Sequence, residues 1–95
     1  MARRIAVSSL ARADLIRLRQ FIASESKAAA ALAIQRLLSG VRLLRDFPEL
    51  GVAVRKPFRH LILPYGRSAY VVRYRVTKEE IVIVRIWHGR EKRPL

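Results

Sequence analysis

Several residues in the second half of the chain have side chains suited to phosphate chemistry. His88 can exchange a proton near neutral pH, and Arg59 and Arg90 can each hold a phosphate through two parallel hydrogen bonds. RNA cleavage by attack of a 2′-hydroxyl requires a base, an acid and cations of this kind. The candidate catalytic residues are therefore His88, Arg90 and Arg59, and the reaction would be that of a metal-independent endoribonuclease.

A simpler interpretation competes with catalysis. Histidines at strand ends are often hydrogen-bonded to the backbone, and we favour this structural role for His88 and more strongly for His60. The sequence has no glycine-rich phosphate loop and no Ser-His-Asp order. It also lacks cysteine, and two histidines alone cannot complete a zinc site, so neither a metal site nor a cofactor is predicted.

A second group of residues is suited to binding. Arg73, Arg75 and Arg85 fall in apolar runs typical of strands, which would place them side by side near Trp87. Arginine and aromatic side chains together stack on bases or bind acidic peptides. The alternative is a solvated row of arginines, with Trp87 as a core anchor. The predicted target- or partner-binding residues are Arg73, Arg75, Arg85, Arg90 and Trp87.

The charge of the chain limits its partners. Lys and Arg number 20 against 7 Asp and Glu, which gives a net charge of +13 and a pI near 11.7. No acidic residue occurs in residues 51–77, so the second half is the more electropositive half. Such a chain is suited to polyanions or to an acidic protein partner.

Length and hydropathy predict one domain spanning residues 1–95, because 95 residues can build a single core but not two. A hydrophobic content of 52% favours a well-buried core over disorder. No apolar run approaches the roughly 20 residues of a membrane span, and no secretory leader is recognisable. We therefore expect a cytoplasmic protein without a membrane partner.

Hydrophobic periodicity predicts the order of elements. Residues 3–7 suit a strand, and apolar residues at three- and four-residue steps predict helices from Ser8 or Ser9 to about residue 24 and from about residue 27 to 44. Pro48 and Gly51 end the second helix. Residues 58–63, 70–76 and 81–84 suit strands, the last of them central because both of its faces are apolar. The predicted fold is α+β, a two-helix hairpin packed on one face of a small antiparallel sheet in the order β-α-α-β-β-β.

Three segments in this order resemble the RelE/ParE toxin superfamily of type II toxin–antitoxin systems: residues 47–51 (FPELG), 70–76 (YVVRYRV) and 83–91 (IVRIWHGRE). The start of the first helix, residues 13–15, fits the same pattern. The similarity spans nearly the whole chain, and the ending His88-Gly89-Arg90 looks closer to the ParE type.

The resemblance implies a growth-inhibiting toxin of the plasmid-stabilization kind, neutralised by a cognate antitoxin and reaching operator DNA only through the antitoxin complex. ParE-type members inhibit DNA gyrase, whereas RelE-type members cut ribosome-bound mRNA with basic residues of the sheet and a C-terminal tyrosine. Here His60 and Ile62 stand where ribonuclease members have lysines, Val71 lies near the place of an arginine, and residues 91–95 contain no tyrosine.

The resemblance therefore predicts a ParE-like inhibitor of DNA gyrase. A RelE-like ribosome-dependent mRNA endoribonuclease is the first alternative. A non-toxic basic protein that binds nucleic acid is the second.

Overall fold

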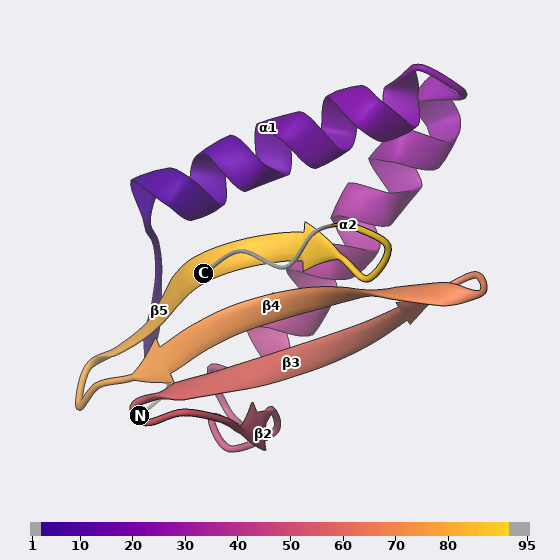
Figure 1. Ribbon diagram of the computed structural model, residues 1–95. Helices are drawn as coiled ribbons and strands as arrows, with labels where there is room; N and C mark the ends of the chain where they lie inside the picture. The colour runs from indigo at the N-terminus through magenta and orange to yellow at the C-terminus, as the bar shows by residue number, and fades with distance from the viewer. Residues whose placement is uncertain (1–2, 92–95) are drawn as a thin grey trace.

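Two helices pack on one face of a five-stranded sheet in the computed structural model, which describes residues 3–91 (Figure 1). The elements are, in chain order, β1 (Arg4–Val7), α1 (Ser9–Ala23), α2 (Lys27–Leu43), β2 (Val52–Ala53), β3 (Phe58–Tyr65), β4 (Ser68–Val76) and β5 (Glu80–His88). The predicted α+β class is confirmed. The additional strand β2 has two residues, too few for a periodic signal in the sequence. Neither helix in the described part of the chain has the length and apolarity needed to cross a bilayer.

The strands lie in the order β1-β5-β4-β3-β2. The pairs β2–β3, β3–β4 and β4–β5 are antiparallel, as predicted, whereas β1 runs parallel to β5. That parallel pairing extends from Arg4 opposite Glu80 to Val7 opposite Ile83, so it covers only the first part of β5. The rest of this edge of β5 is left for α1 to cover.

Serine side chains begin both helices. Ser8 Oγ accepts a hydrogen bond from the Ala11 N–H at 3.1 Å, and Ser26 Oγ accepts one from the Ala29 N–H at 3.1 Å. These are N-cap contacts, which satisfy amides that have no partner within the helix. Ser8 is thus the cap of α1, one of the two serines that the sequence offers for that role.

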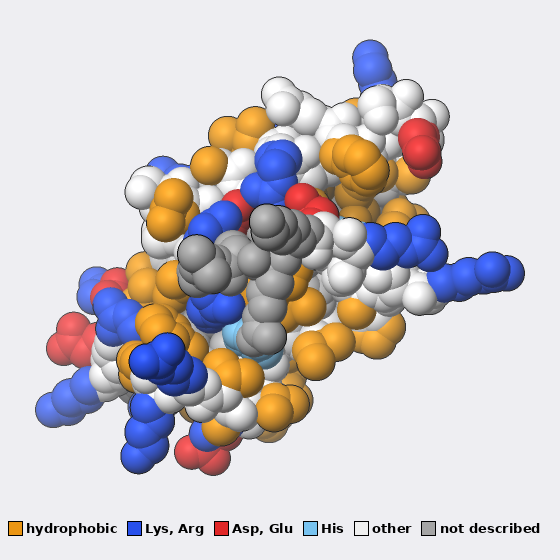
Figure 2. Space-filling model, in the orientation of Figure 1, with side chains coloured by type: hydrophobic (Ala, Val, Ile, Leu, Met, Phe, Trp, Pro, Cys, Tyr) orange, Lys and Arg blue, Asp and Glu red, His pale blue; other side chains and the backbone are white. Residues whose placement is uncertain are grey.

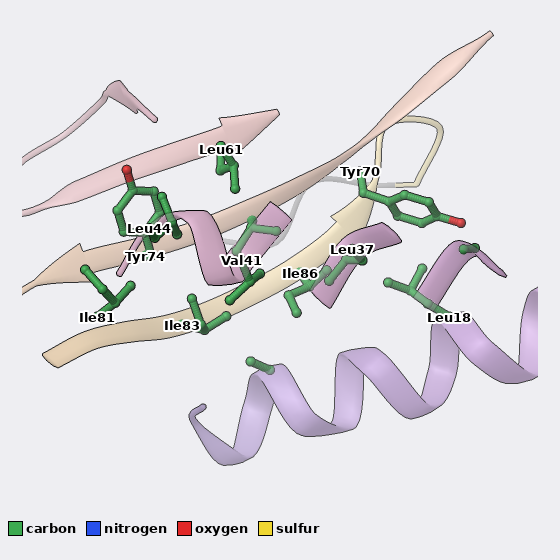
Figure 3. Packing of buried hydrophobic residues seen from close by; sticks show 13 residues of the cluster. Leu18, Leu37, Val41, Leu44, Leu61, Tyr70, Tyr74, Ile81, Ile83 and Ile86 are labelled. Atoms are coloured by element: carbon green, nitrogen blue, oxygen red, sulfur yellow. The ribbon is translucent and has the colours of Figure 1, made fainter. Parts of the chain in front are cut away.

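The core lies between the helices and one face of the sheet (Figure 3). Leu18 of α1 and Leu37 of α2 belong to the same buried cluster as Ile83 of β5 and Tyr70 and Tyr74 of β4. Each of these side chains is at most 3% exposed. Burying an aliphatic side chain of this size stabilises a fold by about 1.5–3 kcal/mol. Both tyrosines of β4 are therefore part of the core.

The segment after α2 is hydrogen-bonded to the buried hydroxyl group of Tyr74. Tyr74 Oη donates to the Pro48 carbonyl at 2.8 Å and accepts from the Gly51 N–H at 2.8 Å. A Cβ at Gly51 would lie 2.6 Å from this hydroxyl, so only glycine allows the approach. Arg59 adds a hydrogen bond to the Gly51 carbonyl at 2.8 Å. The predicted helix stop is therefore also a loop anchored to the sheet.

We predict that Tyr74→Phe destabilises the protein by about 2 kcal/mol, because it leaves a buried N–H and a carbonyl without their partner. Urea unfolding at neutral pH measures the loss. Tyr65→Phe, which removes a hydroxyl from a half-buried tyrosine of β3, is the matched control and should change stability by less than about 0.5 kcal/mol. Equal stability of the two variants would contradict the anchoring role of Tyr74.

Candidate target-binding face and C-terminal turn

Part of the predicted binding set lies on the sheet face that points away from the helices. Tyr70, Val72 and Tyr74 of β4 point into the core, so the alternating Val71, Arg73 and Arg75 point to the other face. Strand register then adds residues of β3 and β5 to that side. We call this surface the open face; it comprises His60, Ile62, Val71, Arg73, Arg75 and Trp87. Figure 2 shows the molecule from this side, with basic and hydrophobic side chains at many places on the visible surface.

Arg73, Trp87 and His60 form a contact cluster at the centre of the open face. The Arg73 guanidinium carbon lies 5.1 Å from the Trp87 ring centroid, and Arg73 Nε donates to His60 Nε2 at 3.1 Å. The His60 and Trp87 rings meet edge to face, with centroids 5.2 Å apart. The cluster therefore orients one guanidinium group on an aromatic surface.

Trp87 is buried, as its place at the end of an apolar strand predicts. It lies on the open face and not among the residues that pack against the helices, because its strand partner is Val71. His60 is also buried. Trp87 is thus both an anchor for the fold and the surface on which Arg73 rests.

Arg85 is the strand partner of Arg73, so the two arginines lie side by side on β4 and β5 as predicted. The Arg85 guanidinium is bonded to Asp14 of α1. Arg85 Nε and Nη2 donate to the Asp14 carboxylate at 2.9 and 3.1 Å. Asp14 also accepts from Arg17 Nη1 at 2.6 Å and from the Ile86 N–H at 2.8 Å.

This environment keeps Asp14 ionised although it is only 2% exposed. Burial by itself would raise the pKa of the carboxyl group. Hydrogen bonds from Arg85, from the Ile86 amide and from Arg17 outweigh burial, so the pKa of Asp14 lies below its ordinary value. The coulombic attraction between the Arg85 guanidinium and the Asp14 carboxylate also lowers the pKa of Asp14, by less than the hydrogen bonds do.

The last residue of β5, His88, and the tight turn after it contain two of the candidate catalytic residues, His88 and Arg90. The His88 ring packs edge to face on Tyr70, with centroids 5.2 Å apart, and its Nδ1 accepts from the Arg90 N–H at 3.2 Å. The interpretation of His88 as a strand-end histidine bonded to the backbone is confirmed. The Arg90 side chain is exposed.

The three candidate catalytic residues do not converge. Arg59 is the strand partner of Tyr74 and donates to the loop after α2, whereas His88 is the partner of Tyr70, four residues away along β4. Four residues of strand span about 13 Å. No group of three His, Cys, Asp or Glu residues suited to a metal occurs within residues 3–91. The missing C-terminal tyrosine, which distinguishes this chain from RelE-type members, concerns a segment of which residues 92–95 lie outside the described residues.

Sequence reasoning missed the residues that organise this region. Neither Arg17 nor Asp14 is among the candidate catalytic or binding residues that the sequence predicts. Asp14 and Arg17 are three residues apart on a helix, a spacing from which their ion pair could have been predicted. The contact of Arg17 with Glu91 joins residues 74 positions apart and leaves no local signal.

A separate groove of about 470 Å³ lies between β1 and α2. Its apolar lining comes from both elements, and arginines surround it. The lining residues are Arg4, Ile5, Val7, Leu38, Val41, Arg42 and Arg45. The groove thus combines aliphatic side chains with positive charge, a pairing that suits an apolar segment carrying carboxylates.

Comparison with known proteins finds similar chains in one group. A family model described as the ParE toxin of type II toxin-antitoxin system, parDE, matches residues 5–93. Toxin RelE1 of Caulobacter vibrioides is 35% identical over 89 residues, which cover 94% of this chain and 96% of the relative. Toxin RelE3 of the same organism is 36% identical over 83 residues, covering 87% and 90%.

A solved structure has the same fold. The chain resembles a chain from the chromosomal ParDE TA system of P. aeruginosa with a TM-score of 0.73 and 23% sequence identity. The alignment covers 92% of this chain and 96% of the other. At 23% identity this similarity shows that the two chains share a fold, and it shows nothing further.

We predict that Asp14→Asn lowers stability at neutral pH by about 2–3 kcal/mol, because it removes the charge that two guanidinium groups surround; their partial exposure reduces the loss expected for a fully buried pair. The depressed pKa of Asp14 gives a stabilisation that is complete above about pH 4, the ordinary aspartate range, and is lost as the pH falls further.

Urea midpoints between pH 3 and 7 measure both effects. The wild type should lose more stability on acidification than Asp14→Asn does. Asp46→Asn, at an exposed position after α2, is the control and should follow the wild type. Parallel curves for the wild type and Asp14→Asn would show that Asp14 does not couple stability to pH.

Proposed function

The chain belongs to the ParE toxin family of type II toxin–antitoxin systems, and from this we propose that it arrests growth by inhibiting DNA gyrase. Membership of the family implies a cognate antitoxin as partner. The finer assignment of the target rests on the chemistry of the open face and of the C-terminal turn.

The separation of the candidate catalytic residues supports a binding toxin over a nuclease. Cleavage of RNA needs a base, an acid and cations around one phosphate, and His88, Arg59 and Arg90 do not meet at one point. On the open face, Ile62, Val71 and Trp87 form an apolar row across three strands. Apolar and aromatic groups next to arginines are typical of protein interfaces.

One observation favours the alternative of an mRNA endoribonuclease. His60 and Arg73 are hydrogen-bonded on the open face, which puts a titratable group beside a cation. Relatives of this chain carry the name RelE. The functional test therefore has to compare both targets.

The high net charge by itself would also suit the third candidate, a non-toxic protein that binds nucleic acid.

The groove between β1 and α2 is our candidate docking site for the antitoxin. Arg4, Arg42 and Arg45 would pair with carboxylates of an amphipathic segment whose apolar side chains enter the groove. Leu38 is 36% exposed at the groove, so a docked segment would remove apolar surface from water.

We predict that the purified chain inhibits gyrase-catalysed supercoiling and leaves translated mRNA intact, and that Arg90→Ala weakens the inhibition. Arg90 extends from an exposed turn beyond β5, so its loss should change stability by less than about 0.5 kcal/mol. Supercoiling and mRNA-cleavage assays run in parallel measure the target, and growth after induction with and without the antitoxin measures toxicity.

Arg12→Ala, at an exposed arginine of α1, is the control for the loss of one positive charge. Trp87→Ala is the control for lost folding and should cost about 3–5 kcal/mol. Codon-linked mRNA cuts with unchanged supercoiling would favour the ribonuclease alternative. Normal growth at confirmed soluble expression would contradict toxicity altogether.

We predict that Leu38→Glu weakens antitoxin binding at least about tenfold, because it places a carboxylate among aliphatic groups and opposite an acidic partner. Titration calorimetry with the purified antitoxin measures the affinity. Leu32→Glu makes the same change at a more exposed leucine of α2 that does not line the groove, and should bind as the wild type does. Equal weakening by both substitutions would argue against the groove as the docking site.

A further inference from the structure

A chain of ion pairs connects α1 with the turn after β5. Arg17 Nη1 donates to Asp14 at 2.6 Å, while its Nε and Nη2 donate to the two carboxylate oxygens of Glu91 at 3.0 and 3.2 Å. One guanidinium group thus bridges two acids. Two parallel bonds to one carboxylate fix the relative orientation of Arg17 and Glu91 more closely than a single contact would.

Glu91 in turn organises the backbone of residues 88–91. Its Oε1 accepts from the His88 N–H at 2.8 Å, and its own N–H donates to the His88 carbonyl at 2.9 Å. The Gly89 N–H donates to the Ala69 carbonyl at 2.8 Å, and the Arg90 N–H donates to His88 Nδ1 at 3.2 Å. Each amide of the turn has a partner, so the backbone that carries Arg90 is held in place.

We propose that the Arg17–Glu91 pair is a clasp that positions Arg90 for target binding. Arg17 and Glu91 are then positioning residues, and this role rests on the proposed function of Arg90. Their side chains are 44% and 34% exposed, and ion pairs at such exposure add little to global stability. The effect of the clasp is local, because it restricts a turn at the end of the fold.

The core contact of Asp14 is independent of this clasp. If Glu91 is changed, Asp14 still accepts from Arg85 and from the Ile86 amide. Substituting Glu91 therefore loosens the turn without exposing the buried carboxylate. This separation makes it possible to test positioning apart from folding.

The test uses Glu91→Gln in the full chain, with Glu25→Gln as the matched control at an exposed acid of the α1–α2 turn. Amide hydrogen exchange should be at least about tenfold faster at His88 and Arg90 in Glu91→Gln than in the wild type, with an unchanged melting temperature. Glu25→Gln should exchange at the wild-type rate at these amides. Arg17→Lys, which keeps the charge and loses the paired bonds, should fall between them.

The functional measurement is a double-mutant cycle on supercoiling inhibition. Glu91→Gln should raise the inhibitory concentration about five- to tenfold in the wild-type background and less than about twofold in the Arg90→Ala background, since its effect acts through Arg90. A turn that stays protected in Glu91→Gln would overturn the clasp. Faster exchange with additive effects, or with no effect on inhibition, would overturn the positioning role.

A wild-type chain that leaves supercoiling unchanged would instead overturn the proposed function, and with it the role of Arg90. The exchange measurement would then still decide whether the clasp orders the turn. The two failures are therefore distinguishable.

Discussion

The buried carboxylate of Asp14 joins the helices to the sheet at a strand edge that has no strand partner. β1 pairs only with the first part of β5. At and beyond Ile83, Ser8 donates to the carbonyls of Ile83 and Val84, and Asp14 accepts from the Ile86 amide. Without these contacts, packing α1 beside β5 would bury backbone groups that lack hydrogen bonds. The cost of burying the Asp14 charge is offset by ion pairs with Arg17 and Arg85.

The positions of the acidic residues decide where positive charge is neutralised in a chain with 20 basic and 7 acidic residues. Asp14 and Glu91 are paired with arginines on the α1 side of the sheet. β3 and β4 contain no acid, and Arg73 and Arg75 of β4 lie on the open face. Arg73 is held in place by Trp87 and His60, and this preorganisation lowers the entropy lost when an anionic group of a partner binds.

The two proposed binding surfaces lie in different parts of the fold. The groove lies between β1 and α2, at one edge of the sheet, whereas the open face extends over β3, β4 and β5. Both surfaces combine apolar side chains with arginines, and both therefore suit partners with acidic and apolar groups. An antitoxin segment in the groove would neutralise basic residues of α2 and β1, and a target on the open face would meet Arg73 and Arg75.

The sequence by itself determined the fold class, the two helices and the three long strands, because these depend on local periodicity, capping and turn residues. Tertiary structure decided which acids Arg17 and Arg85 pair with. Arg85 is paired with Arg73 across β4 and β5, but its guanidinium bonds Asp14, which α1 brings to this edge of the sheet. Arg17 and Glu91 meet only when α1 packs beside β5. Contacts between residues this far apart depend on packing in three dimensions, which a one-dimensional pattern of hydrophobic and charged residues does not encode.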